Sequence, residues 1–368
     1  MNIHLDTIFD CTEKLLARWR NYNNDSNQIH LNMIEQCQQL ALAIFGFIAF
    51  DFDLQTLDNE NNSDKHELTR AFYTHLSAAM LFIRLPTIIG RLYLVLNPEY
   101  RQARAIIDRY LQQMIEQELQ ENSAMRAERK RTSFIASLIT SLQQDEKLEA
   151  TKIEEDKKGL SRAEVIGEML SFLSAGYSTV STALVWFIYF MSKHSQIQSK
   201  IKRELAEYHL QRLSVEQLGS LTYLDCVLRE LFRLVPPVSG TVRTLVVDDR
   251  LPASGAPLKK GDQVFIPFYN LARDSCYWSE SMDLNEFHPE RFFNENMAYN
   301  NKAASIPFGG GHRQCMGQDL TRLELKAICV RLMQFVTFGD GGPEVNAGGY
   351  NEMDTILPKH IGVTITFD

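Results

Sequence analysis

The sequence contains no Cys-x-x-Cys pair, no internal repeat and no long run of charges of one sign. The irregular spacing of its six cysteines indicates neither a disulfide framework nor a zinc site, and it favours a reducing compartment. The basic clusters at residues 126–131 and 152–158 are short and mixed with acidic residues, and the net charge is −8. We therefore expect no nucleic-acid partner.

A secretory signal is also missing, because the N-terminus has neither a basic flank nor an apolar core. Residues 169–192 carry no charge and could span a bilayer by length. They contain many Ser and Thr residues, however, and Ser161 and Glu164 form a capping-box pattern that starts the helix well outside the apolar core. A long buried helix of a globular protein is the better interpretation.

What the sequence does contain is mainly helical periodicity, with strand patterns confined to its second half. A small antiparallel sheet is expected from residues 243–247 and 263–267, and residues 362–367 alternate as a strand does. Loops are expected at residues 21–27, 59–65 and 144–158. We interpret residues 1–368 as a single, mainly α domain with small antiparallel β-sheets. The helices are expected at residues 8–19, 31–50, 66–79, 98–120, 132–143, 161–192, 195–208, 223–234 and 318–336.

The most informative segment is residues 308–317, which read FGGGHRQCMG. Its glycines allow a flat ligand to approach the backbone. Cys315 lies just before a predicted helix, where a thiolate is stabilised and can ligate iron. Arg313 suits a carboxylate partner. The alternative is a glycine-rich loop followed by an ordinary buried cysteine.

A second pattern is Glu230-x-x-Arg233, on a helix with an apolar face that Pro236 and Pro237 end. Residues three apart on a helix share a face, so the two side chains can pair. A buried pair needs further hydrogen-bond partners. Downstream, residues 289–292 read PERF.

These patterns, in this order and spacing, resemble those of the cytochrome P-450 family, whose haem motif is F-x-x-G-x-R-x-C-x-G. The resemblance implies the P-450 fold. It also implies a bound iron protoporphyrin IX, or heme b, with Cys315 as its axial thiolate ligand; this group is called haem from here on. The resemblance further implies that Arg291 joins Glu230 and Arg233 in one buried cluster. The further haem-binding positions that it implies are Arg313, Arg243, Phe308, Gly311, Gly317 and Ala175.

Arg243 matches a position that reaches a haem propionate, whereas the alternative is a solvated strand arginine. Residues 175–179, AGYST, resemble the family's A/G-G-x-D/E-T motif on the helix that crosses the distal face of the haem. There Gly176 is expected to open the helix, and the Thr179 hydroxyl to relay protons. The alternative for Thr179 is a hydrogen bond to the carbonyl four residues earlier. Ser178 replaces the family's acid, so slower oxygen activation is expected.

The implied activity is that of a haem-thiolate monooxygenase, which inserts one atom of dioxygen into a small apolar substrate. Electrons would come from NADPH through a separate flavoprotein reductase. The motifs are closest to those of the microsomal branch, which implies the cytoplasmic side of the endoplasmic reticulum, with membrane association in a full-length form. Candidate substrate-pocket residues by resemblance are Phe172, Ala175, Val238, Ser239 and Ile356.

The family's W-x-x-x-R helix has no counterpart, because none of Trp19, Trp186 and Trp278 has an arginine four residues later. The first helices and strands of the family are also unmatched, so the chain is interpreted as N-terminally shortened and, without an anchor, as cytoplasmic. Two alternatives remain. One is a haem-thiolate isomerase or dehydratase that does not use dioxygen, and the other is a truncated, non-catalytic member of the family.

Overall fold

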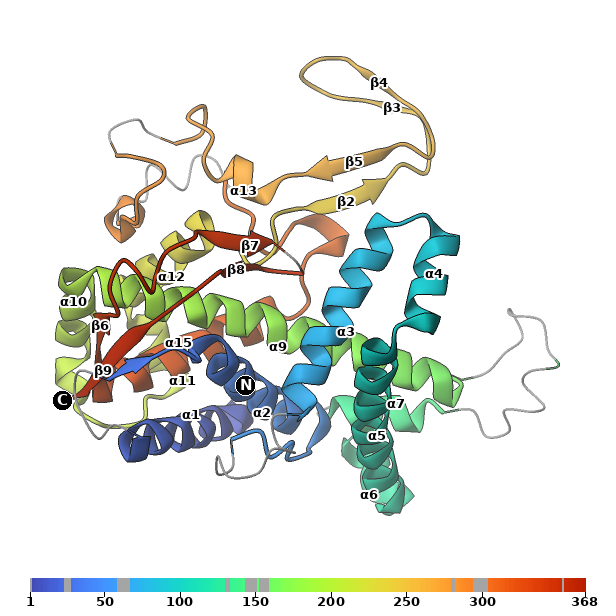
Figure 1. Cartoon of the computed structure of the whole chain (residues 1–368), viewed down its shortest axis with the longest axis horizontal. Helices are drawn as coiled ribbons and strands as arrows, with labels where there is room; N and C mark the ends of the chain where they lie inside the picture. Colours follow the sequence, from blue (N-terminus) through green and yellow to red (C-terminus); the bar gives the residue numbers. More distant parts are fainter. Residues whose placement is uncertain are drawn as a thin grey trace. The chain divides into compact units, whose positions relative to one another are not determined.

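The computed structural model describes residues 2–22, 28–57, 67–129, 133–142, 151, 159–278, 282–293, 304–352 and 354–368. The expected loops at 23–27 and 59–65, and that at 144–158 apart from residue 151, lie outside these ranges. The fold is mainly α with small antiparallel sheets, as predicted (Figure 1). The chain forms two compact units, residues 1–25 with 32–181 and residues 26–31 with 182–368. That the whole chain acts as one domain stays a prediction.

The regular elements in the described part of the first unit are all helices, apart from an isolated bridge between Leu142 and Leu160. Within this unit α1 packs against α2, and α3 packs along α5. Figure 1 shows α1 and α2 in blue, side by side. Its helices are α1 (Asn2–Tyr22), α2 (Met33–Phe50), α3 (Glu67–Arg84), α4 (Thr87–Leu96), α5 (Pro98–Gln120), α6 (Ser123–Arg129), α7 (Phe134–Thr140) and the first part of α9 (Arg162–Lys193).

Two helix starts show how local sequence fixes these elements. At α5 the Asn97 Oδ1 atom accepts a hydrogen bond from the Tyr100 N–H at 3.0 Å, and Pro98 occupies the first helical position. At α9 the predicted capping box is present. Ser161 N–H donates to Glu164 Oε2 at 2.8 Å, and Glu164 N–H donates to Ser161 Oγ at 3.2 Å.

The two helices α2 and α9 are long and apolar enough to cross a membrane. Most of each apolar stretch is nevertheless buried inside the protein, 72% in α2 and 67% in α9. This burial agrees with the interpretation of α9 as a core helix.

The second unit combines the end of α9 with shorter helices and all of the sheets. Its helices are α10 (Ser195–Leu205), α11 (Val215–Ser220), α12 (Thr222–Leu234), α13 (Phe268–Leu271) and α15 (Gln318–Phe335). A three-stranded antiparallel sheet has the order β1 (Ile29–His30), β9 (Val363–Phe367), β6 (Val336–Asp340). The antiparallel pairs are β2 (Thr241–Thr244) with β5 (Gln263–Ile266), β3 (Asp249–Arg250) with β4 (Pro257–Leu258), and β7 (Tyr350–Glu352) with β8 (Ile356–Pro358).

The predicted sheet is confirmed as the β2–β5 pair, in which Arg243 lies opposite Val264, and β9 is the predicted C-terminal strand. The sequence interpretation missed the helices α4, α6 and α11 and the strands β1, β3, β4, β6, β7 and β8. In α4 the apolar side chains Ile88, Leu92 and Val95 are exposed, so the helix has no clear polar face to reveal its period. Strand β6 follows α15 directly, and no glycine or proline marks the change.

Candidate functional site

The cysteine loop is held closed by main-chain hydrogen bonds. The Cys315 N–H donates to the Phe308 carbonyl at 2.8 Å, and the Gln314 N–H donates to the Gly311 carbonyl at 3.1 Å. Gly309 and Gly311 have φ angles of 73° and 69°. An L residue rarely adopts these left-handed conformations, so the turn depends on glycine at both positions.

Cys315 is exposed, which rules out the alternative of an ordinary buried cysteine. It lies three residues before the start of α15 at Gln318, and Gly317 is the N-cap residue of that helix. The unpaired N–H groups and the dipole of the first turn favour a negative charge there. The thiol is therefore accessible and lies close to the N-terminus of a helix.

Aromatic packing connects this loop to α12. The rings of Phe308 and Phe232 meet edge to face, with centroids 5.2 Å apart. The guanidinium of Arg322, on α15, lies 5.4 Å from the centre of the Phe308 ring. Arg313 is exposed and has no hydrogen-bond partner among the described residues, so its guanidinium is available to a carboxylate.

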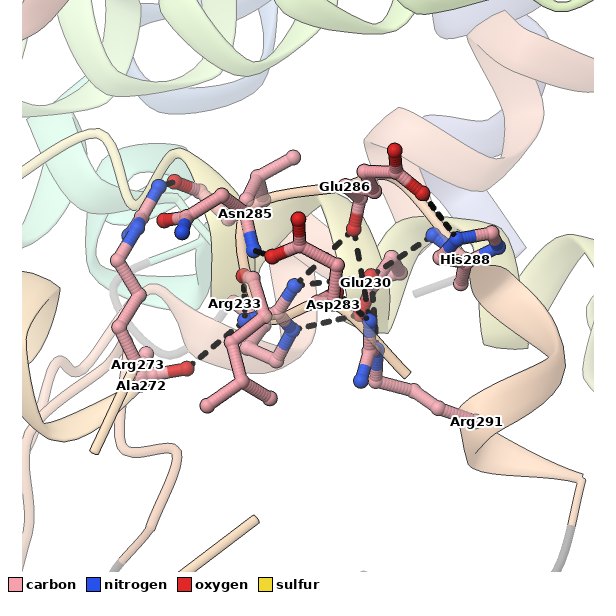
Figure 2. A network of polar contacts seen from close by, with 11 residues as sticks. Glu230, Arg233, Ala272, Arg273, Asp283, Asn285, Glu286, His288 and Arg291 are labelled. Atoms are coloured by element: carbon pink, nitrogen blue, oxygen red, sulfur yellow. Dashed lines mark hydrogen bonds and ion pairs between the residues drawn. The ribbon is translucent and has the colours of Figure 1, made fainter. Parts of the chain in front are cut away.

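The predicted cluster of Glu230, Arg233 and Arg291 is present and buried, with exposed fractions of 0%, 0% and 8%. Figure 2 shows the Glu230 carboxylate between the two guanidinium groups. Arg233 Nε donates to Glu230 Oε2 at 2.7 Å, and Arg291 Nε donates to Glu230 Oε1 at 2.9 Å. The main-chain N–H of His288 also donates to Glu230 Oε1, at 2.9 Å.

Arg233 Nη2 also donates to Glu230 Oε1, at 3.0 Å, and further guanidinium N–H groups of this cluster donate to main-chain carbonyls. Arg233 Nη1 donates to the carbonyls of Ala272 and Leu284, both at 2.9 Å, and Arg291 Nη2 donates to that of Asp283 at 2.9 Å. These bonds provide the extra partners that a buried ion pair requires. Because Phe232 is adjacent to Arg233 on α12, the cluster also fixes the helix against which the cysteine loop packs.

Arg243 is half-buried on β2. Its Nη1 atom donates to Thr241 Oγ1 at 2.7 Å and to the Val242 carbonyl at 2.9 Å. Both acceptors belong to its own strand, and the other guanidinium N–H groups have no acceptor among the described residues. The propionate contact stays a prediction.

The AGYST segment lies on α9, in the first unit. The Thr179 hydroxyl donates to the Ala175 carbonyl at 2.9 Å, which is the geometry of the back-bonding alternative. Ser178 is buried, with 8% exposure, and Ala175 is exposed. The catalytic roles of Thr179, Ser178 and Gly176, and the haem contact of Ala175, stay predictions.

Gly176 has a packing role that sequence reasoning missed. The helix assignment is continuous through this point, and the expected local opening stays a prediction. A Cβ atom at Gly176 would lie 2.4 Å from the ring of Phe45 on α2. A side chain at this position would therefore collide with a neighbouring helix. No sequence period signals this contact, because it joins distant segments.

The proposed pocket residues divide between the two units. Phe172 packs on Phe134 in the first unit, with ring centroids 4.2 Å apart. In the second unit Ile356 is buried and its carbonyl accepts a hydrogen bond from Trp186 Nε1 at 2.6 Å. Val238 is 37% exposed, and the Ser239 carbonyl accepts from the Tyr269 N–H at 3.0 Å.

Comparison with known proteins gives the family. The family model for cytochrome P450 matches residues 5–339, which is most of the chain and runs through both units. The chain belongs to the cytochrome P450 family. The fold is accordingly the predicted P450 fold, and the family implies a haem with a cysteine thiolate ligand.

The similarity to individual P450 relatives is modest. The chain is 27% identical to cytochrome P450 monooxygenase 205 of Postia placenta over 352 residues, which cover 89% of this chain and 64% of that protein. It is 28% identical to cytochrome P450 3A17 of Cavia porcellus over 319 residues (85% and 58%). It is 34% identical to putative cytochrome P450 120 of a Synechocystis species over 183 residues (49% and 40%). The chain thus spans less than two thirds of the length of these relatives.

The residues present fit a haem. The soft thiolate donor suits iron. Cys315 is an exposed sulfur donor on a glycine turn that lets a flat group approach, and Arg313 is an available carboxylate partner. All of the predicted haem-binding residues except Ala175 belong to the second unit. These six are Cys315, Arg313, Arg243, Phe308, Gly311 and Gly317.

Proposed function

We propose that this P450 is a haem-dependent monooxygenase that inserts one atom of dioxygen into a small apolar substrate. Electrons would come from NADPH through a separate flavoprotein reductase. The observation that carries the proposal is the exposed Cys315 thiol, on a loop that a 2.8 Å hydrogen bond to the Phe308 carbonyl closes just before α15. Family membership supports it.

In this proposal the Cys315 sulfur ligates the haem iron, and Arg313 and Arg243 bind the haem propionates. The haem, when bound, supplies the electron transfer and the dioxygen chemistry. The protein residues hold the ligand sulfur in place. The buried Glu230 cluster fixes α12, and the Phe232–Phe308 contact transmits that rigidity to the loop.

The Thr179 hydroxyl is proposed to deliver protons. The Thr179 hydroxyl donates a hydrogen bond to the Ala175 carbonyl, so the O–H must rotate about the Cβ–Oγ1 bond to donate elsewhere. Ser178, which cannot carry a negative charge, is proposed to make the relay weaker than an acid would. Gly176 keeps this turn of α9 close to Phe45.

We further propose that both units act as one haem domain, because the family match crosses the boundary between them. By resemblance to the microsomal branch, a longer form would work on the cytoplasmic side of the endoplasmic reticulum. The apolar substrate would contact the pocket positions predicted from the sequence, including Phe172 and Ile356.

A second candidate is a haem-thiolate isomerase or dehydratase. Ser178 in place of the acid and the back-bonded Thr179 favour it, because such a reaction needs no proton delivery to dioxygen.

Two measurements on the purified chain separate these functions. The first is the amount of haem per chain, and the second is turnover with a flavoprotein reductase and a panel of apolar compounds. Stoichiometric haem, with label from isotopic dioxygen in the product only when NADPH is present, supports the monooxygenase. Haem-dependent turnover without NADPH or dioxygen supports the isomerase. A chain that binds no haem contradicts both and supports the non-catalytic alternative.

A further inference from the structure

The second unit contains a cavity that none of the proposed haem-binding residues lines. Its volume is about 730 Å³, within the range of about 300–1,000 Å³ that is typical of small-molecule sites. It is formed by the C-terminal end of α9, the first two turns of α10, the last residue of α12 and residues 285–290, which run into the PERF segment. The side chains that carry the argument are Phe190, Lys193, His194, Lys200, Phe287 and His288.

The apolar wall of the cavity is aromatic and preformed. Phe190 and Phe287 are buried, with 8% and 4% exposure, and their rings are parallel with centroids 4.2 Å apart. Ile197 and Leu234 extend this wall. The two stacked rings form a fixed apolar wall, which suits a rigid aromatic ligand that can pack against ring edges and any uncovered ring face.

The polar rim has an excess of hydrogen-bond donors. Lys193 Nζ has an ion pair with Asp340 at 2.7 Å, and Lys200 Nζ has one with Glu290 at 2.5 Å. Each ammonium carries three N–H donors. Among the described residues the structure gives each lysine a single acceptor, Asp340 for Lys193 and Glu290 for Lys200. Donors thus remain for an incoming anion.

The two histidines of the rim differ. His288 Nε2 lies 2.8 Å from Glu286 Oε2, whereas the ring of His194 has no hydrogen-bond partner among the described residues. Burial and, secondarily, the neighbouring His288 lower the pKa of His194 below its ordinary value. At neutral pH the His194 ring is therefore uncharged. The cations of the rim are Lys193 and Lys200, each paired with one carboxylate, and Glu286 and Glu290 also line the cavity, so it is the spare N–H donors of the lysines that an anion would use.

We propose that this cavity is a second ligand site, which binds an amphipathic monoanion with a flat apolar body, such as an aryl carboxylate. The apolar body lies on the Phe190–Phe287 wall and the carboxylate accepts from Lys193. The proposal does not depend on the monooxygenase activity, because it uses none of the residues assigned to haem or to proton delivery.

Occupancy of the cavity also acts on the buried cluster. The main-chain N–H of His288, a residue of the rim, donates to Glu230 Oε1 at 2.9 Å. Figure 2 shows His288 beside Glu230 and Glu286. A ligand that holds His288 in place therefore stabilises the native state, and the melting temperature rises with ligand concentration.

The test is calorimetric titration of the whole chain with naphthoate, and with naphthylmethanol as the neutral analogue. Naphthoate is expected to bind saturably with one site per chain and about tenfold more tightly than the alcohol. Lys193→Met is expected to remove that preference. In this variant Asp340 keeps its hydrogen bonds from Gly342 and Asn346, so the fold tolerates the change.

A matched pair of variants locates the site. Ser195 lines the cavity and is exposed, whereas Ser199 is exposed one turn later on α10 and does not line it. Ser195→Trp is expected to abolish naphthoate binding and its effect on the melting temperature, and Ser199→Trp to leave both unchanged. The proposal is overturned if naphthoate does not bind saturably, if both tryptophan variants bind it equally, or if the alcohol binds as tightly as the acid.

Discussion

Arg291 Nε donates a hydrogen bond to Glu230 Oε1 over 2.9 Å, although the two residues are 61 positions apart in the chain. This contact joins the helix that supports the cysteine loop to the PERF segment. Glu230 is fully buried and accepts hydrogen bonds from both arginines and from the His288 N–H, so its carboxylate is the acceptor that these three groups share.

Glu230→Ala is expected to lower the free energy of unfolding by about 3–5 kcal/mol, because it leaves two buried guanidinium charges without their partner. Chemical denaturation measures the change. Asp225→Ala on the same helix removes an exposed partner of Lys326 and is the control, with an expected loss of about 0–1 kcal/mol. Equal stability of the two variants would show that the cluster does not scaffold the loop.

Cys315→Ser is expected to abolish the strongly red-shifted Soret band of the reduced carbon monoxide complex, because that band requires a thiolate ligand to the iron. The control is Cys276→Ser, which removes another exposed cysteine and is expected to leave the band unchanged. Persistence of the band in Cys315→Ser would disprove the assignment of the ligand.

Gly176→Ala and Gly167→Ala are expected to have opposite effects on stability, although both replace a glycine in α9. At Gly167 nothing lies within 4 Å of an added Cβ atom, so the better helix former stabilises the protein by up to about 1 kcal/mol. At Gly176 the added methyl group meets the ring of Phe45, and overpacking costs about 1–3 kcal/mol.

Thermal and denaturant unfolding measure both variants. Phe45→Leu in the Gly176→Ala background is expected to recover part of the loss by removing the ring. If both alanine variants gained stability, close packing between α2 and α9 would not explain Gly176.

Thr179→Ala is expected to lower the amount of product formed per NADPH, with peroxide as the by-product. A positioned proton-transfer group is worth roughly 10²–10⁴-fold in rate. Ser178→Asp is expected to raise the same ratio by restoring the acid. The control is Ser171→Ala, which removes an equivalent hydrogen bond, from Ser171 Oγ to the Gly167 carbonyl at 2.8 Å, two turns earlier on α9. The control is expected to leave the ratio unchanged, and unchanged ratios in both Thr179→Ala and Ser178→Asp would favour the isomerase.

Glu324 gives a prediction for the pH dependence of stability. It is fully buried on α15, and burial raises its pKa to about 8 from an ordinary value near 4.5. Between these two pH values the native state binds more protons than the unfolded state, so this residue lowers stability as the pH rises.

Glu324→Gln stays uncharged and is expected to be more stable than the parent protein, by a margin that grows from about pH 5 to about pH 8 and then levels off. Denaturant titrations at several pH values measure the margin. The control is the exposed Glu344→Gln, for which a constant, small difference is expected. A margin that does not change with pH would show that Glu324 is ionised in the native state.

A structural feature can be predicted from sequence when the residues that determine it lie close together along the chain. Helix α5 was predicted with its observed bounds, because Asn97 and Pro98 mark its start locally. The Glu230–Arg233 pair was predictable because three residues make nearly one helical turn. The pairing of β9 between β1 and β6 was not, since its partners lie far away in the chain.

The sequence by itself determined the starts of α5 and α9, the glycine turns of the cysteine loop, the buried pair on α12 and the family of the protein. All of these depend on residues within a few positions of one another or on a fixed order of motifs. Only the tertiary structure decided that Gly176 makes room for Phe45, that Glu324 is buried away from charge, and that Arg233 reaches the carbonyls of distant segments. These features arise when segments remote in the chain pack together and exclude water, and a local pattern carries no information about which segments will meet.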